Sequence, residues 1–359
     1  MLHKPYYNPK KSYEENYNKG PYGSFADRKK FRQTGTPEYD FFGYPVYLPF
    51  GIPAGPVLNS KFVKGAFNNG FDLVVYKTVR SNIYPCHPHP NILHVKVKGN
   101  LTLKKAQRPL VADTKYTEPI SITNSFGVPS KKAVIWQKDV KKAISYEGKG
   151  QLMILSFMGT VRANQTEKQF ITDFTLAAKQ SLKTGAKVLE VNLSCPNIGN
   201  EGLVCYNLKA TEKVLKAIRK VIGKKPLIVK SGYFENQAKL NEFARIVDRY
   251  ANGLAAINTI AAPVVDQKGK QALPGSPVRL KSGICGAAIR WAGLEMVKRL
   301  KELKKKHHFK FKIIGVGGVT RKEDYFRYVR AGADAVMSAT GAMWNPYLAR
   351  EIKERLAHP

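Results

Sequence analysis

The stretch TEKQFITDFTLAAKQSLKTGAKVLEVNLSCPN, residues 166–197, contains the unit from which the fold is predicted. Its first part, 166–186, is of helix length, and we expect Thr166 as its N-cap and Gly185 as its stop. Its second part, AKVLEVNL (186–193), is a continuous apolar run, which is typical of a strand buried on both faces. The stretch therefore predicts a helix followed by a buried strand.

Short apolar runs of the same kind recur along the chain, and helix-length segments separate most of them. Eight such strands, each followed by a helix, predict an α/β fold with a parallel sheet. The count of eight favours a closed (β/α)8 TIM barrel over an open doubly wound sheet. The runs are PVYLPFGIPAG (45–55), DLVVYKT (72–78), LMILSFM (152–158), AKVLEVNL (186–193), PLIVKS (226–231), LAAINTI (254–260), KIIGVGG (312–318) and DAVMSAT (334–340).

Two segments lie outside this pattern. Residues 1–44 are polar, rich in Tyr and Lys and without clear periodicity, so we expect an N-terminal arm that wraps a partner or the domain itself. The barrel domain then spans residues 45–359. Between its second and third strands, about residues 80–130 form a long polar insertion, in which VKVKGNLTLKK (95–105) is expected to form a hairpin.

The chain is strongly basic, with 60 Lys and Arg against 26 Asp and Glu and a formal net charge of +34. Three explanations remain open: nucleic-acid binding, steering of an anionic substrate or acidic partner, and a lysine-rich solvated surface, which we favour. The excess is spread along the chain. Its densest block, KELKKKHHFKFK (301–312), is expected to be an exposed connection between a helix and a strand.

The cysteines and the apolar runs indicate the compartment. Cys86, Cys195, Cys205 and Cys285 are scattered without a CxxC pair, so neither a disulfide framework nor an iron–sulfur site is expected. The first twenty residues lack the apolar core of a secretory signal, and no apolar run reaches the roughly 18 residues of a membrane span. We therefore expect a cytoplasmic protein without a membrane anchor.

The C-terminal ends of the strands are where an active site forms in such barrels. The last two strands end in GVGG (315–318) and ATGA (339–342), whose backbone N–H groups at helix-opening turns are suited to bind phosphate. Other strand ends and connections carry polar groups where core packing would prefer none. These are Lys77, Asn124, Asn192, Cys195, Lys230 and Asn258.

The chemistry of these groups narrows the possible ligands. A lysine that ends a buried strand must meet an anion or an electron-rich ring, or else lose its charge. Together with a phosphate site, Lys77 and Lys230 indicate flavin mononucleotide (FMN). The asparagines offer both donors and acceptors, which suits a planar ring substrate with alternating C=O and N–H groups.

Several sequence blocks at these positions are recognisable as a set. They are the KT pair at 77–78, NSFGVPS (124–130), VNLSCPN (191–197), IVKSGY (228–233), INTI (257–260), SGICGAAIR (282–290) and IIGVGG (313–318). In this order, over roughly residues 45–355, the chain resembles the dihydroorotate dehydrogenase family. Its soluble, cysteine-using branch matches better than the membrane-bound, serine-using branch. The chain also resembles the pyrimidine-reducing domain of dihydropyrimidine dehydrogenase.

The resemblance implies roles for individual residues. Cys195 would be the general base that removes a proton from C5 of (S)-dihydroorotate while a hydride leaves C6 for flavin N5, which yields orotate for pyrimidine biosynthesis. Lys77 would lie close enough to the substrate to offset its charge. The residues implied to hold the substrate are Asn124, Asn192, Asn197, Asn258 and Thr259. Those implied to contact FMN are Ala54, Gly55, Lys77, Thr78, Asn192, Lys230, Gly283, Gly317, Gly318, Thr340 and Gly341.

The substrate and the partners leave alternatives. Dihydropyrimidine dehydrogenase resembles this chain but has a histidine at the position of Asn197, so the asparagine favours an orotate-type substrate. The alternatives are a flavin enzyme acting on uracil-like dihydropyrimidines, an RNA dihydrouridine synthase, and a non-catalytic barrel that binds a partner. The implied electron acceptor is fumarate, or NAD through a partner subunit. We expect a homodimer, no bound metal, and neither a membrane nor a nucleic-acid partner.

Overall fold

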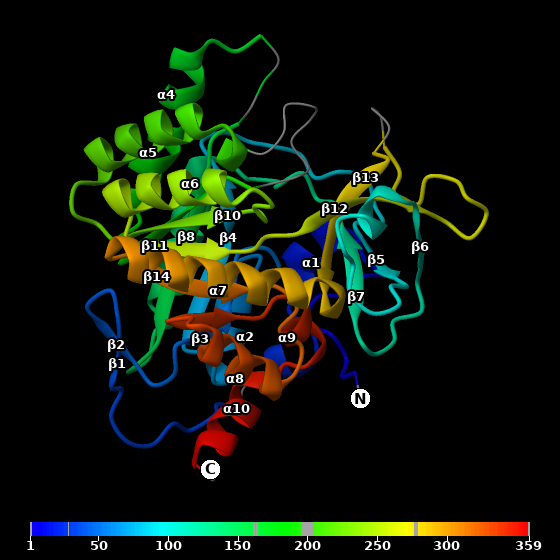
Figure 1. The fold of residues 1–359 in the computed structure, drawn as a ribbon. Coiled ribbons are helices and arrows are strands. Elements are labelled where there is room, and N and C mark those ends of the chain that lie inside the picture. The colour runs from blue at the N-terminus through cyan, green and yellow to red at the C-terminus, as the bar shows by residue number, and fades with distance from the viewer. Residues whose placement is uncertain are drawn as a thin grey trace.

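The computed structural model describes residues 2–27, 29–160, 162, 164–194, 204–275 and 279–357. Within these ranges, eight parallel strands close into a barrel in the order β3-β4-β8-β9-β10-β11-β14-β15, which confirms the predicted (β/α)8 fold (Figure 1). Each strand overlaps one of the eight predicted runs. The strands are β3 (Phe50–Ile52), β4 (Leu73–Arg80), β8 (Leu152–Met158), β9 (Val188–Asn192), β10 (Leu227–Ser231), β11 (Gly253–Ala256), β14 (Lys312–Val316) and β15 (Ala335–Met337).

Helices follow the barrel strands and pack around them (Figure 1). They are α2 (Ser60–Asn68), α3 (Ala133–Ile144), α4 (Glu167–Leu182), α5 (Leu208–Ile222), α6 (Gln237–Tyr250), α7 (Arg290–His307), α8 (Lys322–Ala331), α9 (Thr340–Trp344) and α10 (Leu348–Ala357). Short 3-10 turns η3 (Val204–Tyr206) and η4 (Ala287–Ile289) precede α5 and α7.

The predicted start and end of helix α4 are confirmed at Thr166 and near Gly185. The hydroxyl of Thr166 accepts a hydrogen bond from the backbone N–H of Gln169, whose side chain in turn accepts one from the N–H of Thr166. This capping box satisfies two backbone donors at the start of the helix. Helix α4 ends at Leu182, and Gly185 adopts a φ of +83° in the turn before β9. Glycine adopts such a conformation without steric cost.

The basic block 301–312 differs from the prediction, because α7 continues through it to His307. Only residues 308–311 connect this helix to β14. Lysine and leucine are good helix formers, and Leu300 and Leu303 keep a buried face along the last turns. The block is therefore mainly the polar side of a helix.

Side chains inside the barrel alternate with side chains that face the helices. Ile154, Val188 and Ile228 belong to the apolar cluster within the barrel. The hairpin of β1 (Tyr39–Phe41) and β2 (Tyr44–Val46) adds Phe41 and Val46 to the same cluster. Two residues nearer the C-terminal ends of the four adjacent strands β4, β8, β9 and β10, the inward positions carry polar side chains, which we call the polar layer. Its members are Lys77, Ser156, Glu190 and Lys230, with relative exposures of 6%, 0%, 0% and 4%.

A second, smaller barrel stands beside the first, at the right of Figure 1, and was not predicted as such. Its strand order is β12-β13-β7-β5-β6, and it combines the 80–130 insertion with a second insertion between β11 and α7. The run LAAINTI therefore belongs to two strands, β11 and β12. The strands of the small barrel are β5 (Ile92–Val95), β6 (Leu110–Asp113), β7 (Ser121–Asn124), β12 (Ile260–Val265) and β13 (Lys281–Gly286).

The predicted hairpin at 95–105 is wrong. Strand β5 does pair with antiparallel neighbours, but these are β6, with His94 opposite Asp113 and Val95 opposite Ala112, and β7, with Ile92 opposite Asn124. A connection that includes the 3-10 turn η2 (Lys105–Gln107) lies between β5 and β6. Both hydrogen-bonded partners of β5 thus lie farther along the chain than the local alternation indicated.

The N-terminal arm packs against the domain itself. It contains α1 (Tyr13–Lys19) and the 3-10 turn η1 (Gly23–Phe25). The ring of Tyr6 stacks on that of Phe25 with a centroid distance of 4.0 Å and meets Phe62 of α2 edge-on at 6.2 Å. Tyr6, Tyr7 and Tyr13 are all buried. Residues that read as a polar arm therefore contribute aromatic rings to the main core.

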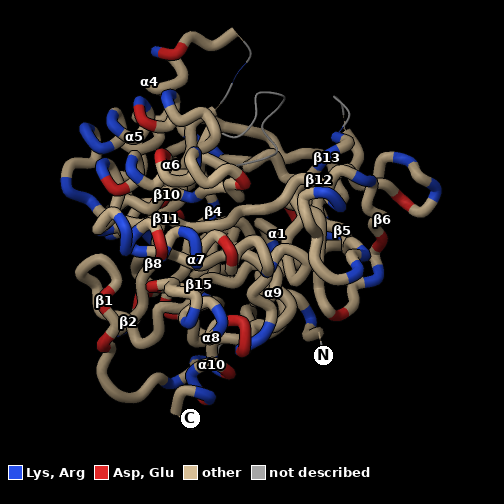
Figure 2. Tube along the Cα trace, in the orientation of Figure 1, with Lys and Arg blue, Asp and Glu red and all other residues tan. Residues whose placement is uncertain are grey.

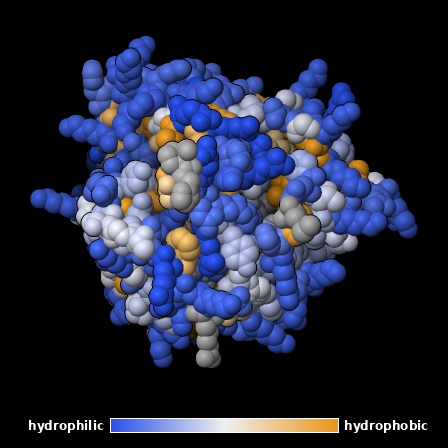
Figure 3. Space-filling view, turned by 90° about the horizontal axis from the view of Figure 1, so that it is seen from below, coloured by the Kyte–Doolittle hydropathy of each residue, from blue (hydrophilic) through white to orange (hydrophobic). Residues whose placement is uncertain are grey.

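Positive charge covers much of the surface. Lys and Arg are distributed over the outer helices and the small barrel in Figure 2, and they outnumber Asp and Glu in both parts. The face seen in Figure 3 is mostly hydrophilic, with scattered apolar residues. Over the described part of the chain, no helix has both the length and the apolar character to cross a membrane.

Truncation of one arm tyrosine tests whether the arm is part of the folded core. Tyr6→Ala should lower the free energy of unfolding by about 3–5 kcal/mol, as expected for loss of a buried aromatic ring. Tyr6→Phe is the matched control, because the Tyr6 hydroxyl is buried without a hydrogen-bond partner among the described residues, and its removal should not destabilise the protein. Urea unfolding measures both, and a loss below about 1 kcal/mol for Tyr6→Ala would contradict the packing.

Candidate active site

Two adjoining cavities, of about 130 and 100 Å³, lie at the C-terminal mouth of the large barrel. We call them together the mouth cleft. The residues that line both are Ala54, Gly55, Asn124, Phe126, Asn258 and Thr259. Ala54 and Gly55 follow β3 of the large barrel. Asn124 ends β7 of the small barrel and Phe126 follows it, while Asn258 and Thr259 lie between β11 and β12. The cleft therefore forms where the two barrels meet.

The larger cavity of the cleft is mainly an apolar slot with a few polar groups. Its apolar lining includes Pro53, Pro56, Ile92, Ile122, Ile257, Val316 and Met343. Its polar members include Lys230 at the end of β10 and Thr340 at the start of α9. The Cys285 sulfur accepts hydrogen bonds from Thr340 Oγ1 at 3.3 Å and from Asn124 Nδ2 at 3.4 Å. Such a slot suits a flat ring system.

The smaller cavity contains Lys77, whose ammonium group is buried. It donates hydrogen bonds to the carbonyl oxygens of Thr78 and Pro129. Burial, together with the positive charges of Arg80 and Lys131, lowers the pKa of Lys77 from 10.5 to about 7. A lysine so balanced between its charged and neutral forms gains a proton readily when an anion binds beside it.

Hydrogen bonds orient the amide side chains around this lysine. Asn192 Oδ1 accepts from the backbone N–H of Ser194 at 3.1 Å, while its Nδ2 lies 3.5 Å from Thr78 Oγ1. Asn258 Nδ2 donates to the carbonyl oxygen of Ser194 at 2.8 Å. Thr259 Oγ1 is buried and has no partner among the described side chains and backbone. A bound molecule would therefore meet the oriented amide groups of Asn192 and Asn258 and the hydroxyl of Thr259, which has no hydrogen-bond partner among the described residues.

Most of the residues predicted from the sequence come together here. Those that line the cleft are Ala54, Gly55, Lys77, Thr78, Asn124, Asn192, Lys230, Asn258, Thr259 and Thr340. Gly283 lies next to it, because a Cβ there would stand 2.5 Å from Thr259 Oγ1. Cys195 and Asn197 fall outside the described residues. Ser194, which precedes Cys195, is held by Asn258 at the edge of the cleft.

Two glycines are needed for their backbone conformation. Gly55 has a φ of +141° and lines both cavities, and no atom lies within 4 Å of the position a Cβ would take. Gly318 has a φ of +71°, and a Cβ there would meet the backbone of Arg290 at 2.5 Å. Gly317 precedes Gly318, and a Cβ on Gly317 would lie 3.1 Å from the side chain of Ile257, which lines the slot. The predicted glycine turn therefore packs closely behind the cleft.

Several cleft residues were not predicted. Tyr7 lines the larger cavity and Tyr13 the smaller one, although both belong to the arm. The arm has no periodic pattern that could have placed them. Phe126 lies within the recognised block NSFGVPS, and its ring meets Tyr7 edge-on at 5.8 Å. Cys285, to which the sequence analysis gives no role in the site, also lines the larger cavity.

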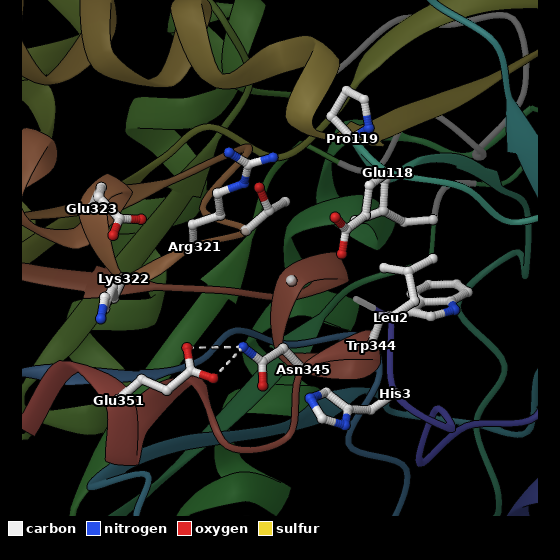
Figure 4. A pocket seen from close by; sticks show the side chains of 13 residues that line it. Leu2, His3, Glu118, Pro119, Arg321, Lys322, Glu323, Trp344, Asn345 and Glu351 are labelled. Carbon is white, nitrogen blue, oxygen red and sulfur yellow. Dashed lines mark hydrogen bonds between the residues drawn. The ribbon is translucent and has the colours of Figure 1, made fainter. Parts of the chain in front are cut away.

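A larger cavity of about 420 Å³ lies outside the mouth cleft, between the N-terminal residues and the starts of α8 and α9 (Figure 4). Its charges are mixed: Arg321 faces the same space as Glu118 and Glu351, and Asn345 binds both carboxylate oxygens of Glu351. Gly341 is the one predicted site residue that lines it. Most of the other predicted site residues that the structure describes line the mouth cleft, which is therefore the candidate active site.

Comparison with known proteins gives a consistent picture. The family model for dihydroorotate dehydrogenase matches residues 39–359. The dihydroorotate dehydrogenase of Dictyostelium discoideum is 36% identical over 361 residues, which cover 97% of this chain and 96% of that protein. The catalytic subunit of dihydroorotate dehydrogenase B (NAD(+)) of Brachyspira hyodysenteriae is 32% identical over 166 residues, 46% of this chain and 52% of that subunit.

A ligand-free crystal structure of DHODH from Eimeria tenella has a TM-score of 0.68 and 18% identity, and the match covers 90% of this chain and 87% of that one. At this identity the likeness concerns the fold alone. The family model and the Dictyostelium relative span nearly the whole chain. The chain therefore belongs to the dihydroorotate dehydrogenase family, whose members are oxidoreductases acting on a CH–CH donor.

Proposed function

We propose that this chain catalyses the FMN-dependent oxidation of (S)-dihydroorotate to orotate, a step of pyrimidine biosynthesis. The observation that carries the proposal is the convergence of Lys77, Asn124, Asn192 and Asn258 on one cleft at the barrel mouth. Amides that both donate and accept suit the C=O and N–H groups of the pyrimidine ring. A cation beside them suits the substrate's carboxylate.

The apolar slot is the part of the cleft that would hold the flavin ring. Lys230 lines it and would offset negative charge on the reduced ring, and Thr340 would bind at the phosphate end together with the backbone of Gly317 and Gly318. Ala54, Gly55 and Thr78 would line the ring, because small side chains there let the ring approach the backbone. FMN, when bound, supplies the acceptor for the hydride that leaves C6 of the substrate.

Cys195 supports the proposal through its place in the sequence. It follows the barrel strand β9 by three residues, just after Ser194, which Asn258 holds at the cleft. We propose that its sulfur takes the proton from C5 of the substrate, while Asn197 and Thr259 help to orient the ring. A thiol suits this work, because its ordinary pKa of about 8.5 lies near the working pH.

The identity of the electron acceptor depends on whether the chain has a partner subunit, and the mouth cleft does not determine it. Fumarate would need no further protein, whereas NAD would need a partner subunit. The Brachyspira relative, a catalytic subunit of an NAD(+)-dependent enzyme, supports the second route for proteins of this family. The three described cysteines are free, which fits the reducing cytoplasm that we propose as the compartment. We also propose a homodimer.

The central test uses purified, FMN-loaded protein with dihydroorotate as donor and a panel of acceptors. Cys195→Ala should lower the rate of orotate formation by about 10²–10⁴-fold, as expected for loss of a general base, while FMN stays bound. Cys86→Ala is the matched control, because Cys86 is a free thiol outside the cleft lining. Burial raises its pKa to about 12, so it carries no charge near Lys77 at working pH, and its removal should leave the rate unchanged. Uracil reduction is assayed in parallel. Preference for uracil, or substantial orotate formation by Cys195→Ala, would contradict the assignment.

Lys77 should give the FMN-free protein a characteristic pH dependence. Its pKa is about 7 in the folded chain and near 10.5 when unfolded, so between these values the unfolded state binds the extra proton. Stability contributed by Lys77 therefore rises as the pH rises from 7 towards 10.5. Lys77→Met should remove this rise, measured as the change in unfolding free energy between pH 7 and pH 9. Lys179→Met, at an exposed helix position, should keep the parent slope, and an equal slope in Lys77→Met would contradict the buried ammonium.

A further inference from the structure

A buried carboxyl group lies directly below the mouth cleft. Glu190 is in the middle of β9, on the inward side that also carries Val188 and Asn192, and its relative exposure is 0%. Neither of its oxygens makes a hydrogen bond of regular geometry to a described residue. An isolated carboxylate at such a depth would be very unfavourable, so its surroundings must compensate the charge or keep the group neutral.

The charged group that acts on Glu190 is Lys230. Strands β9 and β10 are adjacent and parallel, with Glu190 opposite Ile228 and Asn192 opposite Lys230. Lys230 therefore lies two residues nearer the C-terminal mouth of the barrel than the level of Glu190. Burial raises the pKa of Glu190 above its ordinary value, and the positive charge of Lys230 and the hydroxyl of Ser156, its register partner on β8, oppose this rise. Lys230 in turn lines the apolar slot of the cleft.

Lys77 shows what happens to a lysine of the polar layer without a carboxylate beside it. The charged groups that act on it, apart from the Cys86 thiol, are the cations Arg80 and Lys131, and its pKa falls to about 7. Lys230 is buried to a similar degree, with exposures of 4% against 6%. Among the described residues, one difference between the two sites is the acid Glu190, which acts on Lys230.

We propose that Glu190 is a positioning residue that keeps Lys230 protonated and directed into the slot, so that its charge stabilises the reduced flavin ring. The inference rests on the proposed function, because it assumes that FMN occupies the slot. Besides Glu190, the described titratable group that faces Lys230 is the thiol of Cys285 on β13. Burial raises the pKa of that thiol, so it stays neutral and cannot replace the carboxylate.

The midpoint potential of bound FMN in the full-length protein, measured from pH 6 to pH 9, tests this role. In Glu190→Gln we expect Lys230 to lose its proton at alkaline pH. At pH 9 the ratio of oxidised to reduced flavin at a given potential should then rise about tenfold, equivalent to a potential about 30 mV lower for a two-electron couple. At pH 6 Lys230 regains its proton, and the potential should be no lower than that of the parent protein.

Two further variants separate this role from general damage. In the Lys230→Met background, adding Glu190→Gln should not change the potential at pH 9, because the carboxyl acts through the lysine. Asp72→Asn is the matched control: Asp72 is also a buried acid, 2.8 Å from Lys353, but it precedes β4 at the opposite end of the barrel. It should leave the potential unchanged even if it lowers stability.

The outcomes distinguish this inference from the proposed function. A parent chain that binds no FMN contradicts the proposed function itself. A chain that oxidises dihydroorotate, but whose Glu190→Gln potential matches or exceeds the parent value at pH 9, overturns only the role of Glu190. If Glu190→Gln fails to fold while the double variant with Lys230→Met folds, the unpaired buried lysine is the cause, and the pairing is supported.

Discussion

The alternation of side chains along eight parallel strands is the constraint on which the site depends. Every second residue of a strand enters the barrel, and within one such step the inward residues change from Val188 and Ile228 to Glu190 and Lys230. A slip of β9 by one residue would turn Glu190 towards the helices and bring Val191 inside. The apolar interior therefore stabilises the barrel and also fixes the height at which polar groups reach the mouth.

The polar layer contains two lysines, Lys77 and Lys230, whose charged neighbours differ. Lys77 donates to backbone carbonyls and has cations as its charged neighbours, so its charge is only marginally maintained. Lys230 has the carboxyl of Glu190 below it. A lysine that is only partly charged, such as Lys77, suits a substrate that arrives and leaves with its own negative charge. A lysine whose charge is balanced by a carboxyl group, such as Lys230, suits a flavin ring that stays bound. The neighbours of each lysine thus match the residence time of the ligand proposed for it.

The large barrel and most of the cleft could be predicted because the information is local. Each barrel strand is a continuous apolar run, and most site residues lie at or just beyond the end of such a run; Asn124 and Gly283, which belong to the small barrel, are the exceptions. The small barrel could not be predicted in this way, since β7 pairs with β13, more than a hundred residues later, and β12 continues the apolar run of β11. Tyr7 and Tyr13 were missed because burial of the arm depends on the finished surface that it covers.

The small barrel and the arm narrow the open mouth of the large barrel into a cleft. Eight strand ends alone form a shallow rim, but here Asn124 and Cys285 approach from the small barrel and Tyr7 approaches from the arm. Phe126 joins the two additions, since its ring meets both Tyr7 and Tyr13. The slot is mainly apolar, and the charge of Lys230 acts more strongly in such surroundings than it would in water. The arm and the insertions therefore shape the candidate active site together with the strand ends, because they set the medium in which those charges act.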